Sequence, residues 1–281
     1  MGRFARSWAL AKASMGVLRA DKELLLFPLV SSIATLVVAA SFLLPIWGLG
    51  LLRGMSDGGG PTLALYLLLF AFYLVQYFVI FFFNTALVGA AMIRLDGGDP
   101  SVGAGLRIAA GKWTTILGYA AIAATVGLLL RALEERAGFL GRIVIGLLGA
   151  AWTVATYLTV PVLVARDVGP IDAVKESASL LGRTWGENLI GQGGLGLVFT
   201  LVYVLLGVSG VGLVVFLGTQ HLAVAAVVAA CLLLAVFLLL ALVQAALSGI
   251  YSAALYRFAV AGDAPAGFDG ALLRGAFQRK A

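Results

Sequence analysis

Charge is scarce in this sequence, and its scarcity limits the class of protein. Only 11% of the 281 residues are charged, whereas 62% are apolar. A soluble globular chain is nearer a quarter charged and half apolar, because its surface must meet water. The composition therefore excludes an ordinary soluble domain and predicts an all-α integral membrane protein.

The chain also has almost none of the residues that metal and redox sites use. It contains one cysteine, Cys231, and one histidine, His221. A single cysteine excludes an intramolecular disulfide and a multi-cysteine metal site. A histidine-based site needs partners, and the nearest polar neighbours are Thr219 and Gln220. We expect no catalytic residue, no metal and no cofactor, and we expect that the protein is not an enzyme.

Long runs without any charge are what the sequence has in plenty. They are Leu24–Leu52, Gly58–Ile93, Trp113–Leu130, Ile143–Ala165 and Asn188–Tyr256. A helix that crosses the hydrocarbon core needs about 20 apolar residues, so each of the first four runs holds one span. The last run is long enough for two, with "LGTQHLA" (Leu217–Ala223) as a polar turn between them. The sequence therefore predicts six transmembrane helices.

Basic residues are distributed unevenly between the two sides that this topology defines. The amino terminus, two alternate loops and the tail carry fifteen Lys and Arg residues, and the opposite side carries four. The positive-inside rule therefore places both termini in the cytoplasm. The basic excess predicts contact with anionic lipid headgroups. No basic surface with interleaved aromatic residues suggests nucleic acid, while a protein partner or a homo-oligomer remains open.

Three segments on the cytoplasmic side have the apolar spacing of helices that lie along a membrane surface. In the first, one stripe consists of Phe4, Trp8, Ala11, Met15 and Leu18. Residues 98–113 and 169–185 repeat the spacing, and both carry an early proline. We expect Asp99 to be the N-cap of the second helix, with Pro100 in its first turn.

These segments divide a single membrane domain, residues 1–281, into similar units. Residues 1–96, 97–166 and 167–260 would each comprise an interfacial helix followed by two spans, with 261–281 as a cytoplasmic tail. Every unit starts on the same side, so the repeats would be parallel. The alternative is that short cytoplasmic loops become amphipathic without any repeat.

Polar residues in the even-numbered spans form the candidate site. Each span has them at helical spacing, and the members we single out are Gln76, Asn84, Thr156, Gln244 and Ser248. One hypothesis is that these stripes face one another as a polar seam that could admit a headgroup or a small solute. The alternative, which we favour, is interhelical hydrogen bonding that only holds the helices together.

Particular stretches resemble a known family. These are "RSWALAKASMGVLRADKELLLFP" (Arg6–Pro28), "LRALEER" (Leu130–Arg136), "AWTVATYLTVPVLVARD" (Ala151–Asp167) and "ESASLLGRTWG" (Glu176–Gly186). They are similar to six-pass prokaryotic membrane proteins known as domain of unknown function 6159. More distantly, the layout is similar to membrane domains attached to bacterial glycerophosphodiester phosphodiesterases. The resemblance implies a prokaryotic cytoplasmic membrane but carries no activity.

Two functions remain after these exclusions. The first is a non-catalytic membrane component that interacts with lipid or a protein partner, and it agrees with the absence of catalytic motifs. The alternative is a transporter or pore for a small molecule or lipid, with its path between the repeats. No span contains the ionisable residues that a coupled transporter often uses, so the first function is favoured.

Overall fold

The structure is a computed structural model that describes residues 3–48, 63–184, 194–262, 265 and 268. Every regular element in these ranges is a helix, as the composition predicted. The elements are α1 (Arg3–Ala20), the 3-10 helix η1 (Lys22–Leu25), α2 (Leu26–Gly48), α4 (Leu63–Leu95), α5 (Val102–Gly111), α6 (Trp113–Arg136), α7 (Phe139–Ala155), α8 (Thr159–Ala165), α9 (Pro170–Thr184), α11 (Gly194–Thr219) and α12 (Ala223–Ala261). Six segments within them are long and apolar enough to cross a membrane, which agrees with the expected number of spans.

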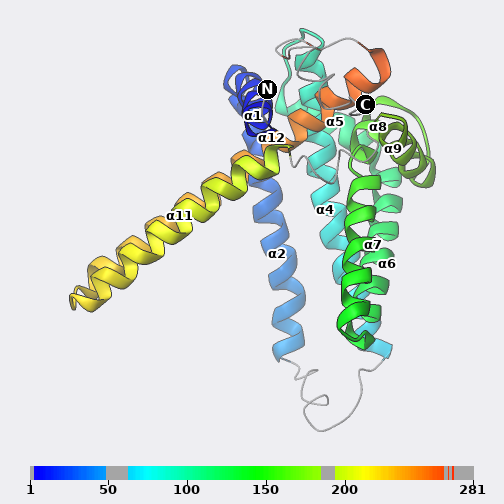
Figure 1. The fold of residues 1–281 in the computed structure, drawn as a ribbon. Coiled ribbons are helices and arrows are strands. Elements are labelled where there is room, and N and C mark those ends of the chain that lie inside the picture. Colours follow the sequence, from blue (N-terminus) through cyan, green and yellow to red (C-terminus); the bar gives the residue numbers. More distant parts are fainter. Residues whose placement is uncertain (1–2, 49–62, 185–193, 263–264, 266–267, 269–281) are drawn as a thin grey trace.

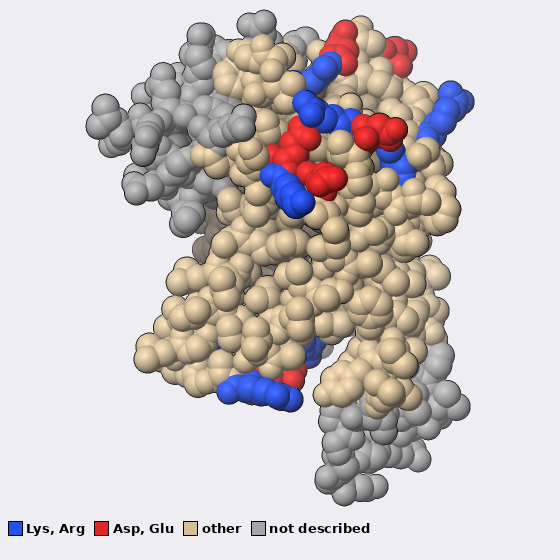
Figure 2. Space-filling model, turned by 90° about the vertical axis from the view of Figure 1, so that its right-hand side faces the viewer, with Lys and Arg blue, Asp and Glu red and all other residues tan. Residues whose placement is uncertain are grey.

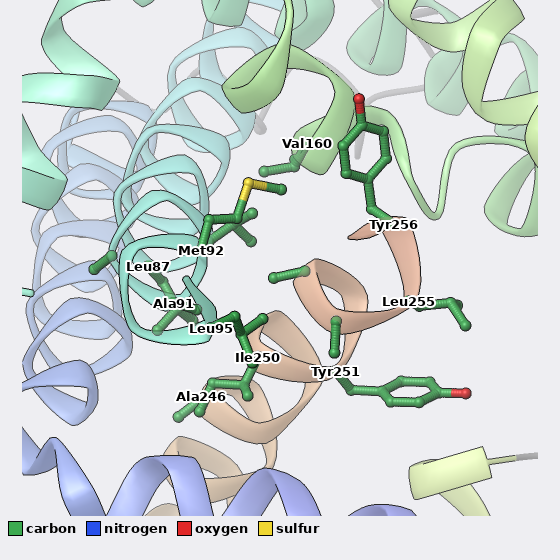
Figure 3. Packing of buried hydrophobic residues seen from close by; sticks show 14 of the residues in the cluster. Leu87, Ala91, Met92, Leu95, Val160, Ala246, Ile250, Tyr251, Leu255 and Tyr256 are labelled. Carbon is green, nitrogen blue, oxygen red and sulfur yellow. The ribbon is translucent and has the colours of Figure 1, made fainter. Parts of the chain in front are cut away.

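Helix α4 is the centre of the packing. It contacts α2, α5, α6, α8 and α12, and its residues from Thr85 to Met92 are all buried. The carboxyl-terminal part of α12 is buried as completely, from Ala246 to Tyr256 apart from Ser248. Figure 3 shows where the two helices meet, with Leu87, Ala91, Met92 and Leu95 of α4 facing α12.

Small residues allow α5 to lie directly against α4. A Cβ atom on Gly105 would come within 2.6 Å of the Ala86 carbonyl oxygen and within 2.6 Å of the Phe27 ring. Real Cβ atoms do not approach other atoms so closely, so only glycine fits there. In the absence of a hydrophobic force between helices in lipid, such close approach supplies much of the packing energy.

The fourth span is interrupted, although the sequence predicted one continuous run. Helix α7 ends at Ala155 and α8 begins at Thr159. Pro161 has no amide hydrogen, which removes one bond of the helical ladder. Ser177 of α9 fills part of the interruption: its hydroxyl accepts from the Leu158 amide at 3.0 Å and donates to the Ala155 carbonyl at 2.6 Å. A side chain from another helix therefore satisfies backbone groups that the break releases.

The hairpin of α11 and α12 leaves the bundle and diverges from α2 (Figure 1). Its turn occupies the expected place, because α11 ends at Thr219 and α12 begins at Ala223. Along this arm the large apolar side chains are exposed, including Val208 at 74% and Val224 at 79%. Helix α1 packs against both α11 and α12 where the arm joins the bundle.

The three segments expected to lie along the membrane are helices, and α1, α5 and α9 lie at the same end of the bundle (Figure 1). In α1 the residues buried against the protein are Leu10, Ala11, Ser14, Val17 and Leu18. This face shares Ala11 and Leu18 with the expected stripe but leaves Trp8 55% exposed. The side chain of Phe4 lies outside the described residues.

The expected start of the second of these helices was wrong by two residues. Ser101, not Asp99, is the N-cap of α5, and its hydroxyl accepts from the Ala104 amide at 3.1 Å. Pro100 precedes the helix rather than forming its first turn. By contrast, α9 begins at Pro170 as the sequence indicated. Most of the tail, 261–281, lies outside the described residues.

Charged residues gather at the two ends of the molecule, and a band without charge separates them (Figure 2). At the end that carries α5 and α9, ion pairs join residues of different helices or of the turns beside them: Asp21–Arg94 at 2.9 Å, Lys112–Asp167 at 3.0 Å, Arg166–Glu176 at 3.2 Å, and Asp96–Arg257. Burial raises the pKa of the Asp21 carboxyl, and the Arg94 guanidinium opposes that rise. At the other end Arg131 pairs with Glu135 at 3.4 Å.

Candidate ligand-binding cavity

A cavity of about 310 Å³ lies where α2, α4 and α12 meet the interruption of the fourth span. Its polar lining consists of Ser31, Asn84, Tyr157, Ser248 and Ser252. Its other lining residues are Pro28, Ile80, Phe83, Leu87, Ala245 and Gly249. None of these side chains is charged. The cavity thus combines an apolar wall with a few polar groups, as small-molecule sites commonly do.

Asn84 is the most distinctive polar group of the cavity. It lies on α4, and its Oδ1 atom is 3.6 Å from the position that a Cβ on Gly249 of α12 would take. The missing side chain at Gly249 therefore lets the carboxamide lie close to the α12 backbone. Within the described part of the chain, the Asn84 carboxamide forms no hydrogen bond with another residue.

Three serine hydroxyls, besides the phenol of Tyr157, accompany this carboxamide. Ser252 donates to the Gly249 carbonyl at 2.9 Å, which leaves its oxygen able to accept. The hydroxyls of Ser31 and Ser248 form no hydrogen bond among the described residues. In hydrocarbon, lipid tails offer no partner for such groups. The cavity therefore presents donors and acceptors that a ligand or water would have to satisfy.

The cavity lies deep below the ion pairs. Asn84 is ten residues before Arg94 and Ser248 is nine before Arg257. At 1.5 Å per residue, these separations place the carboxamide about 15 Å and the hydroxyl about 14 Å from those cations along the helix axes. Both cations are already paired with carboxylates. Consequently neither supplies an unpaired charge to the cavity.

The five residues singled out from the sequence do not all come together. Asn84 and Ser248 line the cavity, whereas Gln76, Thr156 and Gln244 are not among its lining residues. Gln76 donates to the Thr35 carbonyl of α2 at 3.3 Å. Thr156 donates to the Trp152 carbonyl at 2.8 Å within its own segment. Gln76 thus forms one interhelical hydrogen bond through its Nε2 atom, while its buried Oε1 atom has no partner among the described residues.

The first span contributes residues that the sequence interpretation did not include. Pro28 and Ser31 come from α2, an odd-numbered span, whereas we had sought the site in the even-numbered spans alone. The adjacent serines Ser31 and Ser32 in an otherwise apolar run were the available signal. Ser32 donates to the Pro28 carbonyl at 2.8 Å. Only the packing could distinguish the two serines, because they differ by one position on the same helix.

The chain has one match among the three kinds of comparison with known proteins. Neither a curated protein nor a solved structure matches it. A family model does, over residues 63–268, and the family is described as a family of unknown function, DUF6159. The matched range contains α4 to α12, and with them most of the cavity. Because the match extends over more than half of the chain, the protein belongs to the DUF6159 family.

Proposed function

We propose that the protein is a non-catalytic component of a prokaryotic cytoplasmic membrane that binds a lipid-like molecule in the cavity. Its six spans would have both termini in the cytoplasm, and the three units would be parallel repeats with interfacial helices. The basic residues of the cytoplasmic side would contact anionic headgroups at the surface. This surface contact is separate from the cavity, which lies among the helices.

One observation carries the proposal. The carboxamide of Asn84 and the hydroxyl of Ser248 come from different helices, line the same cavity, and have no hydrogen-bond partner among the described residues. An unsatisfied polar group in a nonpolar environment costs roughly 1–3 kcal/mol in proteins. A bound molecule with its own polar group would form hydrogen bonds with these side chains and remove this cost. Its apolar part would contact the apolar helices in place of bilayer lipid.

The surroundings of the cavity also favour a lipid over a solute from water. Large apolar side chains near the cavity are exposed on α2 and α12, such as Leu36 at 70% and Leu239 at 63%. The lining residue Ala245 is itself exposed, at the point where α12 leaves the bundle. A ligand reaching the cavity from this side would pass through the region that lipid tails occupy.

Replacing Asn84 tests the proposal. We expect Asn84→Leu to lower the amount of lipid that co-purifies with the protein by about tenfold, because one lost partner of a desolvated group is worth roughly 1–3 kcal/mol. Native mass spectrometry of the detergent-purified protein would measure the bound lipid. Ser248→Ala should have the same effect to a smaller extent.

Gln76→Leu is the matched control, because it removes a carboxamide from the same helix but not from the cavity. We expect it to lower thermal stability in detergent while bound lipid stays at the wild-type level per folded protein. Equal lipid retention in the Asn84 and Gln76 variants would contradict the proposal, since the cavity would then not be the site.

The interruption of the fourth span favours a second candidate, a transporter or pore. Discontinuous helices line substrate paths in several transporters, and Tyr157, between α7 and α8, lines the cavity. Transport and simple binding differ in one measurement. A transporter would increase transbilayer movement of a fluorescent lipid in proteoliposomes, whereas a binding protein would leave this rate at the level of empty liposomes.

A further inference from the structure

The geometry points to an uncharged lipid as the occupant of the cavity, one whose polar part is a hydroxyl, ester or amide group and not a phosphate. This inference rests on the proposed function, and it specifies the class of ligand that the same site accepts. It depends on three observations: the charge of the cavity lining, its depth, and the exposed apolar side chains beside it.

The lining contains hydrogen-bonding groups but no cation. Ser31, Asn84 and Ser248 can donate or accept, and Ser252 can still accept. A phosphate would need Lys or Arg to replace its hydration. The nearest cations along α4 and α12, Arg94 and Arg257, are each engaged with a carboxylate of the charged end. A hydroxyl or carbonyl group, by contrast, can be satisfied by Asn84 and the serines alone.

Depth supplies a second, independent argument. Asn84 and Ser248 are about 14–15 Å below Arg94 and Arg257 along the helix axes, in a hydrocarbon core that is about 30 Å thick, while Ser252 lies nearer to Arg257. An ordinary phospholipid keeps its headgroup at the membrane surface, so its phosphate would have to leave water to reach Asn84. An uncharged lipid with a single small polar group loses far less hydration when it sinks to that level.

The exposed lining residue Ala245 indicates that such a lipid enters between α2 and α12. The arm formed by α11 and α12 diverges from α2 (Figure 1), and residues of both α2 and α12 line the cavity. Exposed apolar side chains follow on both sides, with Leu36 and Val37 on α2 and Leu238 and Leu239 on α12. No charged residue occurs in α2 or in α12 before Arg257. The acyl chains would lie along these apolar surfaces, and the polar group would point to Asn84.

Two probes with identical chains test the inference: a diacylglycerol and the corresponding phosphatidate, each with a photoreactive group near the start of one acyl chain. The full-length protein would be placed in phosphatidylcholine nanodiscs with a trace of either probe and irradiated, and labelled peptides would be identified by mass spectrometry. We expect the diacylglycerol to label peptides of α2, α4 and α12 near the cavity at least tenfold more than phosphatidate does.

Two variants make the experiment decisive. Asn84→Leu should abolish the preference for diacylglycerol, while Gln76→Leu should preserve it. Ser248→Lys introduces a cation into the cavity and should raise phosphatidate labelling there at least tenfold. The lysine variant excludes the explanation that altered labelling only reflects unfolding, because an unfolded variant would not gain phosphatidate labelling in the cavity.

The outcomes separate this inference from the proposed function. Equal labelling by both probes, lost in Asn84→Leu, would overturn the preference for an uncharged lipid but retain lipid binding in the cavity. Labelling by neither probe, when lipid still co-purifies in an Asn84-dependent manner, would also overturn it. Labelling by neither probe without any Asn84-dependent lipid would overturn both, and a cavity filled with water would explain that result.

Discussion

At the residue scale, Gly105 and Asn84 illustrate opposite demands of a membrane interior. Gly105 has no side chain, and this allows α5 to contact the backbone of α4 at Ala86. Asn84, by contrast, places a carboxamide among apolar helices, where it has no hydrogen-bond partner in the described residues. One residue contributes to packing, and the other costs stability unless something binds to it.

Gly105→Ala should destabilise the fold. Its new methyl group would meet the Ala86 carbonyl oxygen, an atom of a rigid backbone that cannot rotate away. Overpacking of this kind costs about 1–3 kcal/mol. Titration of the protein from a mild detergent into a denaturing detergent would measure this change in the free energy of unfolding. Gly16→Ala is the control, since no atom lies within 4 Å of the added Cβ. Equal stability of the two variants would show that α5 and α4 are not so close.

At the element scale, the fourth span depends on a residue from a different helix. Its two halves, α7 and α8, do not form one continuous helix. The hydroxyl of Ser177 joins them by bonding to the Ala155 carbonyl and the Leu158 amide. Helix α9, which the sequence indicated as an interfacial helix, is thereby a part of the support for a membrane span. Because Tyr157 lies within this interruption, α9 also helps to position the cavity wall.

Ser177→Ala should weaken this support. It leaves the buried Leu158 amide and the partly buried Ala155 carbonyl without their side-chain partner, at a cost of about 1–3 kcal/mol. Thermal unfolding in detergent would measure the change. Ser179→Ala is the matched control, because Ser179 lies on the exposed side of the same helix, and it should leave stability within about 0.5 kcal/mol of the wild type. A similar loss of stability in both variants would indicate that the helix propensity of α9 causes the change, and not the hydrogen bonds of Ser177 to the interrupted fourth span.

At the scale of the whole molecule, charge and hydrophobicity are separated along one direction. The ion pairs between distant segments lie mostly at the end that carries α5 and α9, and a band without charge lies below them (Figure 2). Large apolar residues are exposed along the helices of this band. A soluble protein would rarely expose so large an apolar area, whereas lipid chains would cover it favourably.

The topology follows from the same distribution and can be tested directly. Reporter fusions after Glu135 and His221 should lie outside the cytoplasm, and fusions after Pro100 and Pro170 should lie inside it. The fifteen basic residues on one side against four on the other set this expectation. Enzymatic reporters that are active on only one side of the membrane would measure it. A fusion at Ala281 that reports the outside would contradict the even number of spans.

Much of the architecture follows from composition and spacing alone. The charge-free runs mark the spans because hydrocarbon admits few charges, and the helical state follows because lipid leaves no other way to satisfy the backbone. The turn at Leu217–Ala223 and the start of α9 at Pro170 were also evident from local residue types. The N-cap of α5 was not evident, because Asp99 and Ser101 are both good capping residues. Only the folded chain shows that the helix starts after Pro100, with Ser101 as its N-cap.

What the tertiary structure decided is which polar residues share a space. Gln76 and Asn84 lie on one helix and are both carboxamides, yet one bonds to the α2 backbone and the other lines a cavity. The difference depends on Gly249, on the angle at which α12 leaves the bundle and on the interruption of the fourth span, none of which a helical period specifies. A sequence determines a side chain's position around its own helix, but only the packing of several helices determines whether that side chain meets a partner or an empty space.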